Sequence, residues 1–138
     1  VFSPARGGKN VVNGRPLQAS LIDKIENAQI AHDWNRAEHL RQSTLRGVTK
    51  LTHEAESIRS FGTAALALAW VAAGRIDGYF NYSLKAWDMA AANLMIRQAG
   101  GRMSTISGEP LDFSSNVDKD CLASNGILHN PLVTYLSK

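Results

Sequence analysis

The chain has 138 residues with 44% hydrophobic and 20% charged positions, values typical of a soluble globular protein with room for one domain but not for two ordinary ones. Its net charge is only +3, and its lysines and arginines are scattered rather than striped, which makes nucleic-acid binding unlikely. Cys121 is the only cysteine, so an internal disulfide is excluded and a reducing, cytoplasmic environment is expected.

The longest apolar run, Ala64 to Ala73, is too short to span a bilayer. The first four residues, Val1 to Pro4, lack the basic start and the apolar core of a signal peptide. We therefore expect no membrane association. Because the chain begins without Met, directly in an expected strand, we also expect a fragment or a processed chain.

Residues 1–20 are expected to form a strand, a turn and a strand. Turn residues occur at 7–10 and again at 13–14, where Asn-Gly is a pair that closes tight hairpins. This turn chemistry suffices to explain the stretch, and we assign it no catalytic residue.

A short apolar strand is predicted at residues 28–31, and it runs into a group of polar and aromatic residues. His32, Asp33 and Trp34 at the end of a strand invite a catalytic interpretation. A helix cap formed by Asp33 or Asn35, with Trp34 packed beneath it, is the commoner arrangement and the one that we expect.

Residues 36–55 alternate apolar and charged positions at helical spacing, which predicts an amphipathic surface helix. Its expected buried face consists of five apolar residues: Ala37, Leu40, Leu45, Val48 and Leu51. His39 and His53 have no second His or Cys at a spacing suited to a metal, so both are expected at the surface.

A strand is predicted at residues 57–61 and a helix at residues 64–73, with Gly62-Thr63 as the turn between them. The helix consists almost entirely of Ala, Leu, Val and Trp, so we expect it to be buried on all sides within a layered fold. Two interpretations of Gly62 stay open. Either the backbone N–H groups at the helix start are free to meet an oxygen-bearing ligand, or Gly62 is only a permissive turn residue.

The rest of the chain continues the alternation of strands and helices. Strands are predicted at residues 76–82, 102–106 and 120–124, and helices at residues 87–98 and from 126 or 127 to 136. Gly100-Gly101 would stop the first of these helices as a C-terminal glycine cap. Alternation from residue 28 onward predicts a layered α/β domain.

Asp88 is a lone carboxylate in an apolar stretch. Trp87 precedes it and small apolar residues at 90–92 follow it, so we expect a buried position with no polar neighbour. A charge so placed costs free energy unless it caps the helix, meets a cation or binds a metal. Capping is the commonest of these roles, and metal ligation is the less common alternative.

Three stretches occur in a specific order along the chain. They are Arg59-Ser60-Phe61-Gly62-Thr63-Ala64-Ala65, then Gly74-Arg75-Ile76-Asp77-Gly78, then Trp87-Asp88-Met89-Ala90-Ala91-Ala92 leading to Ala99-Gly100-Gly101. Together they resemble the C-terminal half of the inositol monophosphatase family of magnesium-dependent phosphatases. A Trp-Asp pair alone is a weak signal, whereas the three stretches in the family's order are a strong one.

The resemblance covers roughly the whole chain and implies its architecture. The family's fold is a five-layer αβαβα sandwich, of which this chain would be the C-terminal half, an α/β layered sandwich. Residues 1–27 would be the hairpin that leaves the absent first half, and residues 28–138 the C-terminal α/β domain. Family members are often dimers, so a homodimer is expected.

The resemblance also implies which residues form the site. Asp88 would be a ligand of Mg2+ and a substrate contact, and Gly62, Thr63 and Ala64 would line the pocket for the alcohol part of the substrate. Asn81 stands where the animal inositol enzymes place a Glu that contacts a ring hydroxyl. An amide both donates and accepts hydrogen bonds, whereas a carboxylate only accepts them, so this departure leaves the substrate's identity open.

The family's remaining metal ligands come from a Glu and an Asp-Pro-x-Asp-Gly-Thr signature, and this sequence contains neither; Asp77-Gly78 is followed by Tyr79. Hydrolysis of a phosphate monoester relies on divalent ions that neutralise the phosphate and lower the pKa of a bound water. One carboxylate cannot build such a site. We therefore expect no catalytic residue on this half and no activity from this chain alone.

The implied function is magnesium-dependent hydrolysis of a small phosphate monoester, with inositol monophosphate as the expected substrate. Related phosphatases act on histidinol phosphate, fructose bisphosphate or phosphoadenosine phosphate, and these substrates stay open. A different class also stays open, namely a non-catalytic regulatory or binding member that meets RNA-processing or transcription partners.

Overall fold

The fold is seen in a computed structural model of the chain, which describes residues 2–3, 11–12 and 14–138. The strands are β1 (Phe2–Ser3), β2 (Val11–Val12), β3 (Arg15–Pro16), β4 (Gln29–His32), β5 (Ser57–Ser60), β6 (Gly78–Leu84), β7 (Arg102–Ser104) and β8 (Lys119–Ser124). The helices are α1 (Glu38–Thr52), α2 (Ala64–Ala72), α3 (Ala86–Gln98) and α4 (His129–Leu136), and a 3-10 turn spans Ile25–Asn27.

The N-terminal strands form a small antiparallel sheet in the order β1-β2-β3. Gly14, at a φ of 78°, lies in the turn between β2 and β3, where a glycine accepts a left-handed backbone without strain. The hairpin expected there is thus present. The turn expected at residues 7–10 lies outside the described residues.

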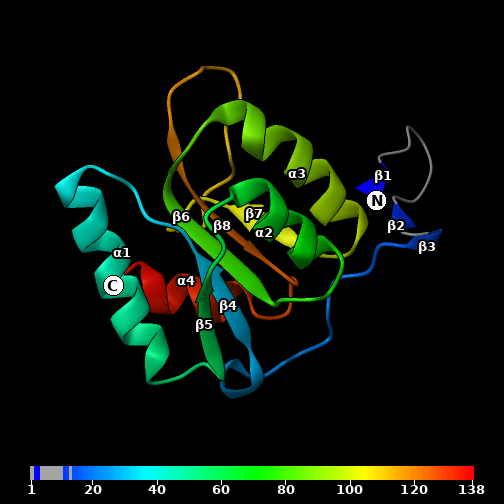
Figure 1. Cartoon of the computed structure of the whole chain (residues 1–138), viewed down its shortest axis with the longest axis horizontal. Coiled ribbons are helices and arrows are strands. Elements are labelled where there is room, and N and C mark those ends of the chain that lie inside the picture. The colour runs from blue at the N-terminus through cyan, green and yellow to red at the C-terminus, as the bar shows by residue number, and fades with distance from the viewer. Residues whose placement is uncertain (1, 4–10, 13) are drawn as a thin grey trace.

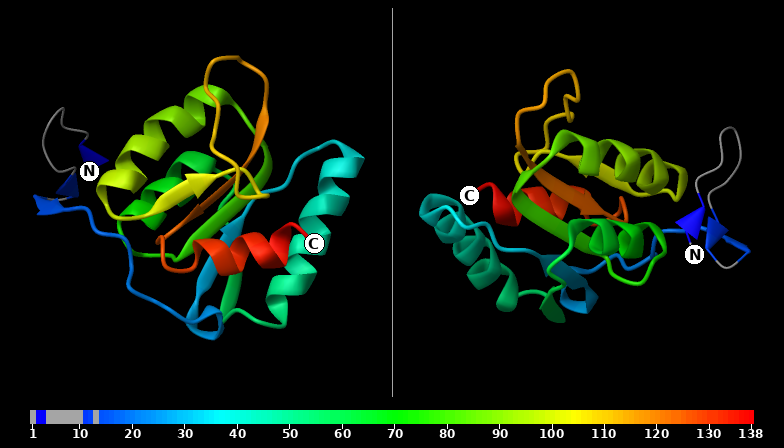
Figure 2. Two further views of the ribbon diagram at one scale, coloured as in Figure 1. Left: turned by 180° about the vertical axis from the view of Figure 1, so that it is seen from behind. Right: turned by 45° about the horizontal axis from the view of Figure 1, so that its top comes forward.

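The main sheet has the strand order β5-β4-β6-β8-β7, and its first three strands are parallel. Strand β8 pairs antiparallel with both β6 and β7. Helices α2 and α3 cover one face of this sheet, and α1 and α4 cover the other (Figures 1 and 2). The layered α/β arrangement predicted from the alternating elements is confirmed.

One hydrophobic core lies on each face of the main sheet. Successive side chains of β6, the central strand, belong alternately to the two cores. Tyr79 packs with residues of α2 and α3, whereas the adjacent Phe80 packs with residues of α1 and α4. Both side chains are fully buried. Because successive side chains of a strand point to opposite faces, a sheet covered on both sides has apolar residues at consecutive positions.

Helix α1 is amphipathic as expected, but its buried face differs from the predicted one. Leu45 is 44% exposed, while Thr44 and Gly47 are buried. A Cβ atom at Gly47 would lie 3.0 Å from Leu136 and 3.1 Å from Phe80, so the helix packs closely onto α4 and β6 at this glycine. The apolar pattern alone could not locate this contact, because glycine contributes no hydrophobic signal.

Helix α2 was predicted to be buried on all sides, and this is wrong. Ala65 and Leu66 are exposed, Leu66 by 40%, whereas the opposite face of the helix is buried. The outer surface of α2 and α3 is left open by the described part of the chain. The all-apolar composition of α2 thus belongs to a helix with one buried face and one face that the described chain leaves uncovered.

Helix α4 begins at His129, two or three residues later than predicted. Gly126 adopts a φ of 92°, and the side-chain oxygen of Asn125 accepts a hydrogen bond from the Leu128 N–H (3.0 Å), so the chain turns before the helix starts. Among the described residues, no helix is both long enough and apolar enough to cross a membrane.

Candidate substrate site at the ends of the parallel strands

The parallel strands end at one edge of the sheet, and the helices that follow them begin there. Strand β4 lies between β5 and β6; it leads to α1 on one face, while β5 and β6 lead to α2 and α3 on the other (Figure 1). In open α/β sheets, ligands bind outside the carboxyl ends of strands whose connections run to opposite faces. Of the five predicted site residues, Gly62 and Thr63 lie in the turn before α2, Ala64 is the first residue of α2, Asn81 is in β6, and Asp88 is in the first turn of α3.

Asp33, at the end of β4, is the centre of a buried hydrogen-bond network. One carboxylate oxygen accepts hydrogen bonds from the Gly62 N–H (2.7 Å) and the Ser60 hydroxyl (3.2 Å), and the other accepts one from the Tyr79 hydroxyl (2.9 Å). The residue is only 7% exposed. Asp33 thereby connects the end of β4 to the end of β5 and to Tyr79 near the start of β6.

The helix cap expected from Asp33 or Asn35 is wrong. The N-cap residue of α1 is Ala37, which makes no side-chain cap hydrogen bond, and the Asn35 amide instead donates to the Ser83 carbonyl (3.2 Å). Trp34 is 49% exposed rather than packed beneath the helix, and its ring meets His32 edge-on. The partners of Asp33 lie 27 to 46 residues away in the sequence, so local pattern could not identify them.

The network settles the role of the Gly62 N–H itself but not of the other N–H groups at the start of α2. Its N–H donates to Asp33 and is not free to meet a ligand. Its φ is 73°, a conformation that favours glycine, so Gly62 serves the turn, while the N–H groups that follow it at the start of α2 stay open to a ligand as a prediction. Thr63 and Ala64 follow it at the start of α2, and Thr63 is exposed.

Asn81 is buried, and its amide is used within the same network. It donates to the Tyr79 hydroxyl (3.0 Å), and its oxygen accepts a hydrogen bond from the Ser83 N–H (2.9 Å). Burial foremost raises the pKa of Tyr79, so its phenol stays protonated and can donate to Asp33. Asn81 is thus held two hydrogen bonds away from the Asp33 carboxylate.

Asp88 was expected in a buried position, and this is wrong: it lies exposed in the first turn of α3, beside Trp87, which is 62% exposed. The N-cap residue of α3 is Lys85, and no side-chain cap hydrogen bond is formed, which speaks against the capping interpretation. The first turn carries the positive end of the helix dipole, which favours a carboxylate there. The Asp88 carboxylate is therefore accessible to a cation.

The donor chemistry of Asp88 fits Mg2+, which prefers hard oxygen ligands and usually takes only one or two protein carboxylates together with water and phosphate oxygens. Within residues 14–138, no three His, Cys, Asp or Glu side chains come close enough together to hold a metal ion. The described residues thus form no complete metal site of such side chains, and Asp88 is an accessible carboxylate at this edge.

Lys85 and Asp118 form an ion pair (2.8 Å) at the start of α3. Asp118 also accepts a hydrogen bond from the Ser83 hydroxyl (3.3 Å), so the loop before β8 is tied to the end of β6. Both charged side chains are at least 36% exposed, so the pair positions the loop more than it stabilises the fold.

The chain is similar to a known family and to known proteins. The sequence model of the inositol monophosphatase family matches residues 1–138. The chain is 37% identical over 109 residues to the Nus factor SuhB of Escherichia coli, covering 78% of this chain and 41% of that protein. It is 34% identical over 139 residues to an inositol-1-monophosphatase of Synechocystis, covering 99% and 47%.

Solved structures agree with these matches. The extragenic suppressor protein suhB of Bartonella henselae superposes with a TM-score of 0.88 at 34% identity, covering 99% of this chain and 52% of that one. The inositol monophosphatase of Anabaena superposes with a TM-score of 0.85 at 29% identity, covering 99% and 53%. The chain thus spans about half the length of the relatives that it matches.

Proposed function

The chain belongs to the inositol monophosphatase family, and on that premise we propose that it forms the C-terminal half of a magnesium-dependent phosphatase acting on a small phosphate monoester, inositol monophosphate first. The observation that carries the proposal is the exposed Asp88 carboxylate, in the first turn of α3 at the edge where the Asp33 network orders the turn before α2. The homodimer and the cytoplasmic location expected from the sequence belong to the same proposal.

In this proposal, each residue of the chain has a separate task. Asp88 is a magnesium ligand, and bound magnesium supplies charge neutralisation on the phosphate and lowers the pKa of a coordinated water. Gly62, Thr63 and Ala64 line the place of the alcohol part of the substrate. Asp33 keeps the turn at Gly62 in one conformation, and Asn81 approaches the alcohol part from β6.

A second function is favoured by one specific observation. Three of the curated relatives that match at 37% identity carry the name Nus factor SuhB. A regulatory or binding role, exercised through transcription or RNA-processing partners, is therefore the alternative, and it does not require a complete metal site. Contact with nucleic-acid machinery belongs to this alternative only.

The test uses a protein that carries both this chain and the metal-binding half. Phosphate release is measured with magnesium on inositol monophosphate, histidinol phosphate, fructose bisphosphate and phosphoadenosine phosphate, and again after chelation. We expect turnover of at least one substrate, lost on chelation and restored by magnesium. A folded protein that releases phosphate from none of them would remove the phosphatase proposal and leave the regulatory one.

A further inference from the structure

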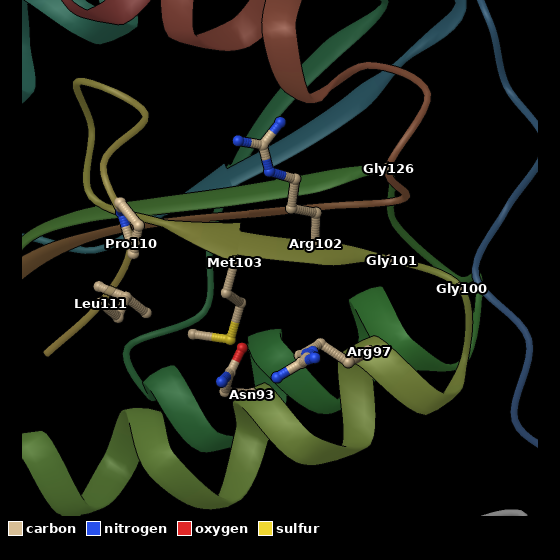
Figure 3. A pocket seen from close by; sticks show the side chains of 9 residues that line it. All are labelled: Asn93, Arg97, Gly100, Gly101, Arg102, Met103, Pro110, Leu111 and Gly126. Carbon is tan, nitrogen blue, oxygen red and sulfur yellow. The ribbon is translucent and has the colours of Figure 1, made fainter. Parts of the chain in front are cut away.

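The groove beside the edge strand β7 does not bring its charged side chains together. It has a volume of about 480 Å³, and its two arginines project to different sides of the strand, Arg97 from α3 and Arg102 from β7 itself (Figure 3). Ligand sites instead place a few polar groups so that they converge on the ligand. In this chain, buried polar side chains converge at the end of β4, next to the predicted site residues.

Three buried side chains form a continuous line of hydrogen bonds from the end of β4 into β6. The Tyr79 hydroxyl donates to one carboxylate oxygen of Asp33 (2.9 Å), and the Asn81 amide donates to the Tyr79 hydroxyl (3.0 Å). The Ser83 N–H closes the line by donating to the side-chain oxygen of Asn81 (2.9 Å). Asp33, Tyr79 and Asn81 are 7%, 0% and 4% exposed, so water has little access to these bonds.

The Asp33 carboxylate sets the direction of this line. A carboxylate only accepts hydrogen bonds, so the Tyr79 hydroxyl uses its single hydrogen toward Asp33, and its oxygen is left to accept from Asn81. Burial foremost raises the pKa of Tyr79, which keeps that hydrogen on the phenol. The amide nitrogen of Asn81 therefore faces Tyr79, and the amide oxygen faces the Ser83 N–H. Rotating the amide by half a turn would set two acceptors against each other at Tyr79 and two donors at Ser83.

The second oxygen of the same carboxylate holds the turn before α2. It accepts hydrogen bonds from the Gly62 N–H (2.7 Å) and the Ser60 hydroxyl (3.2 Å). A Cβ atom placed on Gly62 would meet nothing within 4 Å, so the hydrogen bond, rather than packing around Gly62, holds the turn. Asp33 thus joins two places that the proposed function assigns to the alcohol part of the substrate, the Gly62 turn and Asn81.

We propose that Asp33 is a positioning residue for substrate selection. It does not touch the substrate; it fixes the Gly62 turn and the direction of the Asn81 amide as one unit, so that Asn81 meets the alcohol part in one orientation only. This inference rests on the proposed phosphatase function. The second N–H of the Asn81 amide is used by none of the bonds above, and a hydroxyl on the alcohol part of a phosphate monoester can accept it.

The first test measures substrate selection in the protein that carries both halves. The readout is the ratio of kcat/KM for inositol monophosphate, or the hydroxyl-bearing substrate that the parent prefers, to kcat/KM for phenyl phosphate, whose alcohol part has no further hydroxyl. In Asp33→Asn the new amide keeps an acceptor at only one end, so it disturbs either Tyr79 or the Gly62 turn, and the ratio should fall about tenfold. Tyr79→Phe breaks the line but keeps the Gly62 bond, and the ratio should fall about fivefold.

The matched control is Asp77→Asn. Asp77 is another buried carboxylate, 5% exposed, and it accepts hydrogen bonds from the Gln29 N–H and the Ser20 hydroxyl at the opposite end of the parallel strands. The same substitution there should lower thermal stability and leave the ratio unchanged. An equal fall of the ratio in Asp77→Asn would assign the effect to a general loosening of the fold and overturn the proposal.

A second readout does not depend on activity. With isotope-labelled asparagine, the side-chain amide signals of Asn81 in the NMR spectrum are identified by their loss in Asn81→Asp. They should move in Asp33→Asn and in Tyr79→Phe and stay in place in Asp77→Asn. Unmoved signals in Asp33→Asn, or an unchanged ratio in an active parent, would overturn the proposal. A parent that hydrolyses no phosphate monoester would remove the proposed function instead, and the amide signals would then decide alone whether Asp33 directs Asn81.

Discussion

At the scale of single residues, one buried carboxylate sets the conformation of the candidate site, while a different, exposed one is available to a metal. Asp33 accepts three hydrogen bonds from Ser60, Gly62 and Tyr79. A carboxylate so occupied is a positioning group. Asp88 has no such partners in the described chain, and its role is the one that substitution can test directly.

Asp88→Asn should keep the fold and abolish most phosphatase activity in a protein that carries both halves, because an amide cannot neutralise a bound cation as a carboxylate does. Phosphate release is measured at saturating magnesium, with thermal unfolding as the control for folding. If Asp88 served only the helix terminus, Asn would replace it with little loss. Activity within threefold of the parent would remove the ligand assignment.

Asn81→Glu should change the ranking of substrates more than the overall rate. The new carboxylate cannot donate to the Tyr79 hydroxyl and is costly where no substrate hydroxyl meets it, so substrates without such a hydroxyl should suffer most. The measurement is kcat/KM across inositol, sugar and nucleotide monophosphates. An unchanged ranking would place Asn81 outside the substrate pocket.

The buried environment of His129 leads us to expect that the free energy of unfolding depends on pH. Its ring is fully buried between the hydroxyls of Ser104 (2.7 Å) and Ser124 (2.8 Å), and burial foremost, with Arg102 nearby, lowers the pKa of the imidazole to about 4. The unfolded chain binds the proton near pH 6.5, so the folded state is favoured above that pH and loses stability as the pH falls toward 4. We expect a loss on the order of 3 kcal/mol over this window.

This loss is measured by urea unfolding between pH 7 and pH 4. His129→Gln should be less stable at pH 7, because it alters the pairing of two buried hydroxyls. It should also show a smaller decrease in stability on acidification. An equal decrease in both proteins would assign the pH dependence to other groups.

At the scale of elements, the turn that ends α3 depends on two glycines for different reasons. Gly100 has a φ of 92°, and its N–H bonds the Arg97 carbonyl, while the Gly101 N–H bonds the Ile96 carbonyl (2.8 Å). This is the hydrogen-bond pattern of a glycine-capped helix C-terminus. The stop predicted at Gly100-Gly101 is confirmed.

Substitution by alanine should therefore lower the free energy of unfolding by different amounts at the two glycines. A Cβ atom at Gly100 meets nothing within 4 Å, so Gly100→Ala should lose only about 1 kcal/mol, for its left-handed backbone. A Cβ atom at Gly101 would lie 2.5 Å from the Ser124 carbonyl oxygen, so Gly101→Ala should lose about 3 kcal/mol. Chemical unfolding measures both, and a larger loss at Gly100 would contradict the packing argument.

The contacts of Asp77 show what the Gly-Arg-x-Asp-Gly stretch does in the fold. Its carboxylate is buried and accepts hydrogen bonds from the Gln29 N–H (2.7 Å) and the Ser20 hydroxyl. It joins the start of β4 to the segment that leads out of the N-terminal hairpin. The Gly-Arg-x-Asp-Gly stretch is thus part of the fold's framework rather than of the site.

At the scale of the whole molecule, the outer surface of α2 and α3 is apolar and is not covered by the described part of the chain. Trp87 and Leu94 are 62% and 54% exposed at helical spacing on α3, and Leu66 is 40% exposed on α2. Exposed apolar patches of this kind cause association. In the proposed complete protein, the first half would cover this surface.

We therefore predict that residues 1–138 by themselves self-associate and do not hydrolyse phosphate monoesters. Analytical ultracentrifugation should detect association, and Leu66→Ser combined with Leu94→Ser should reduce it, whereas Leu45→Ser on α1, at similar exposure, should not. Activity is assayed with magnesium and inositol monophosphate, before and after addition of the separately expressed first half. Hydrolysis by the chain alone, lost on Asp88→Asn, would mean that the catalytic site is misplaced here.

Local features of the sequence determined the elements of this protein. Hydrophobic period and turn residues located α2, α3, β5 and the stop at Gly100, because each of these signals acts within a few residues of the backbone. Ordered stretches of specific residues also indicated the family, which the comparisons confirmed.

Only the tertiary structure decided which polar groups meet and which surfaces are covered. Asp33 was expected to cap a nearby helix, yet its partners come from β5, the turn before α2, and β6. Asp88 was expected to be buried because its neighbours are apolar, yet its side of α3 is open. Burial and hydrogen bonding depend on segments far apart in the chain, which local periodicity cannot bring together.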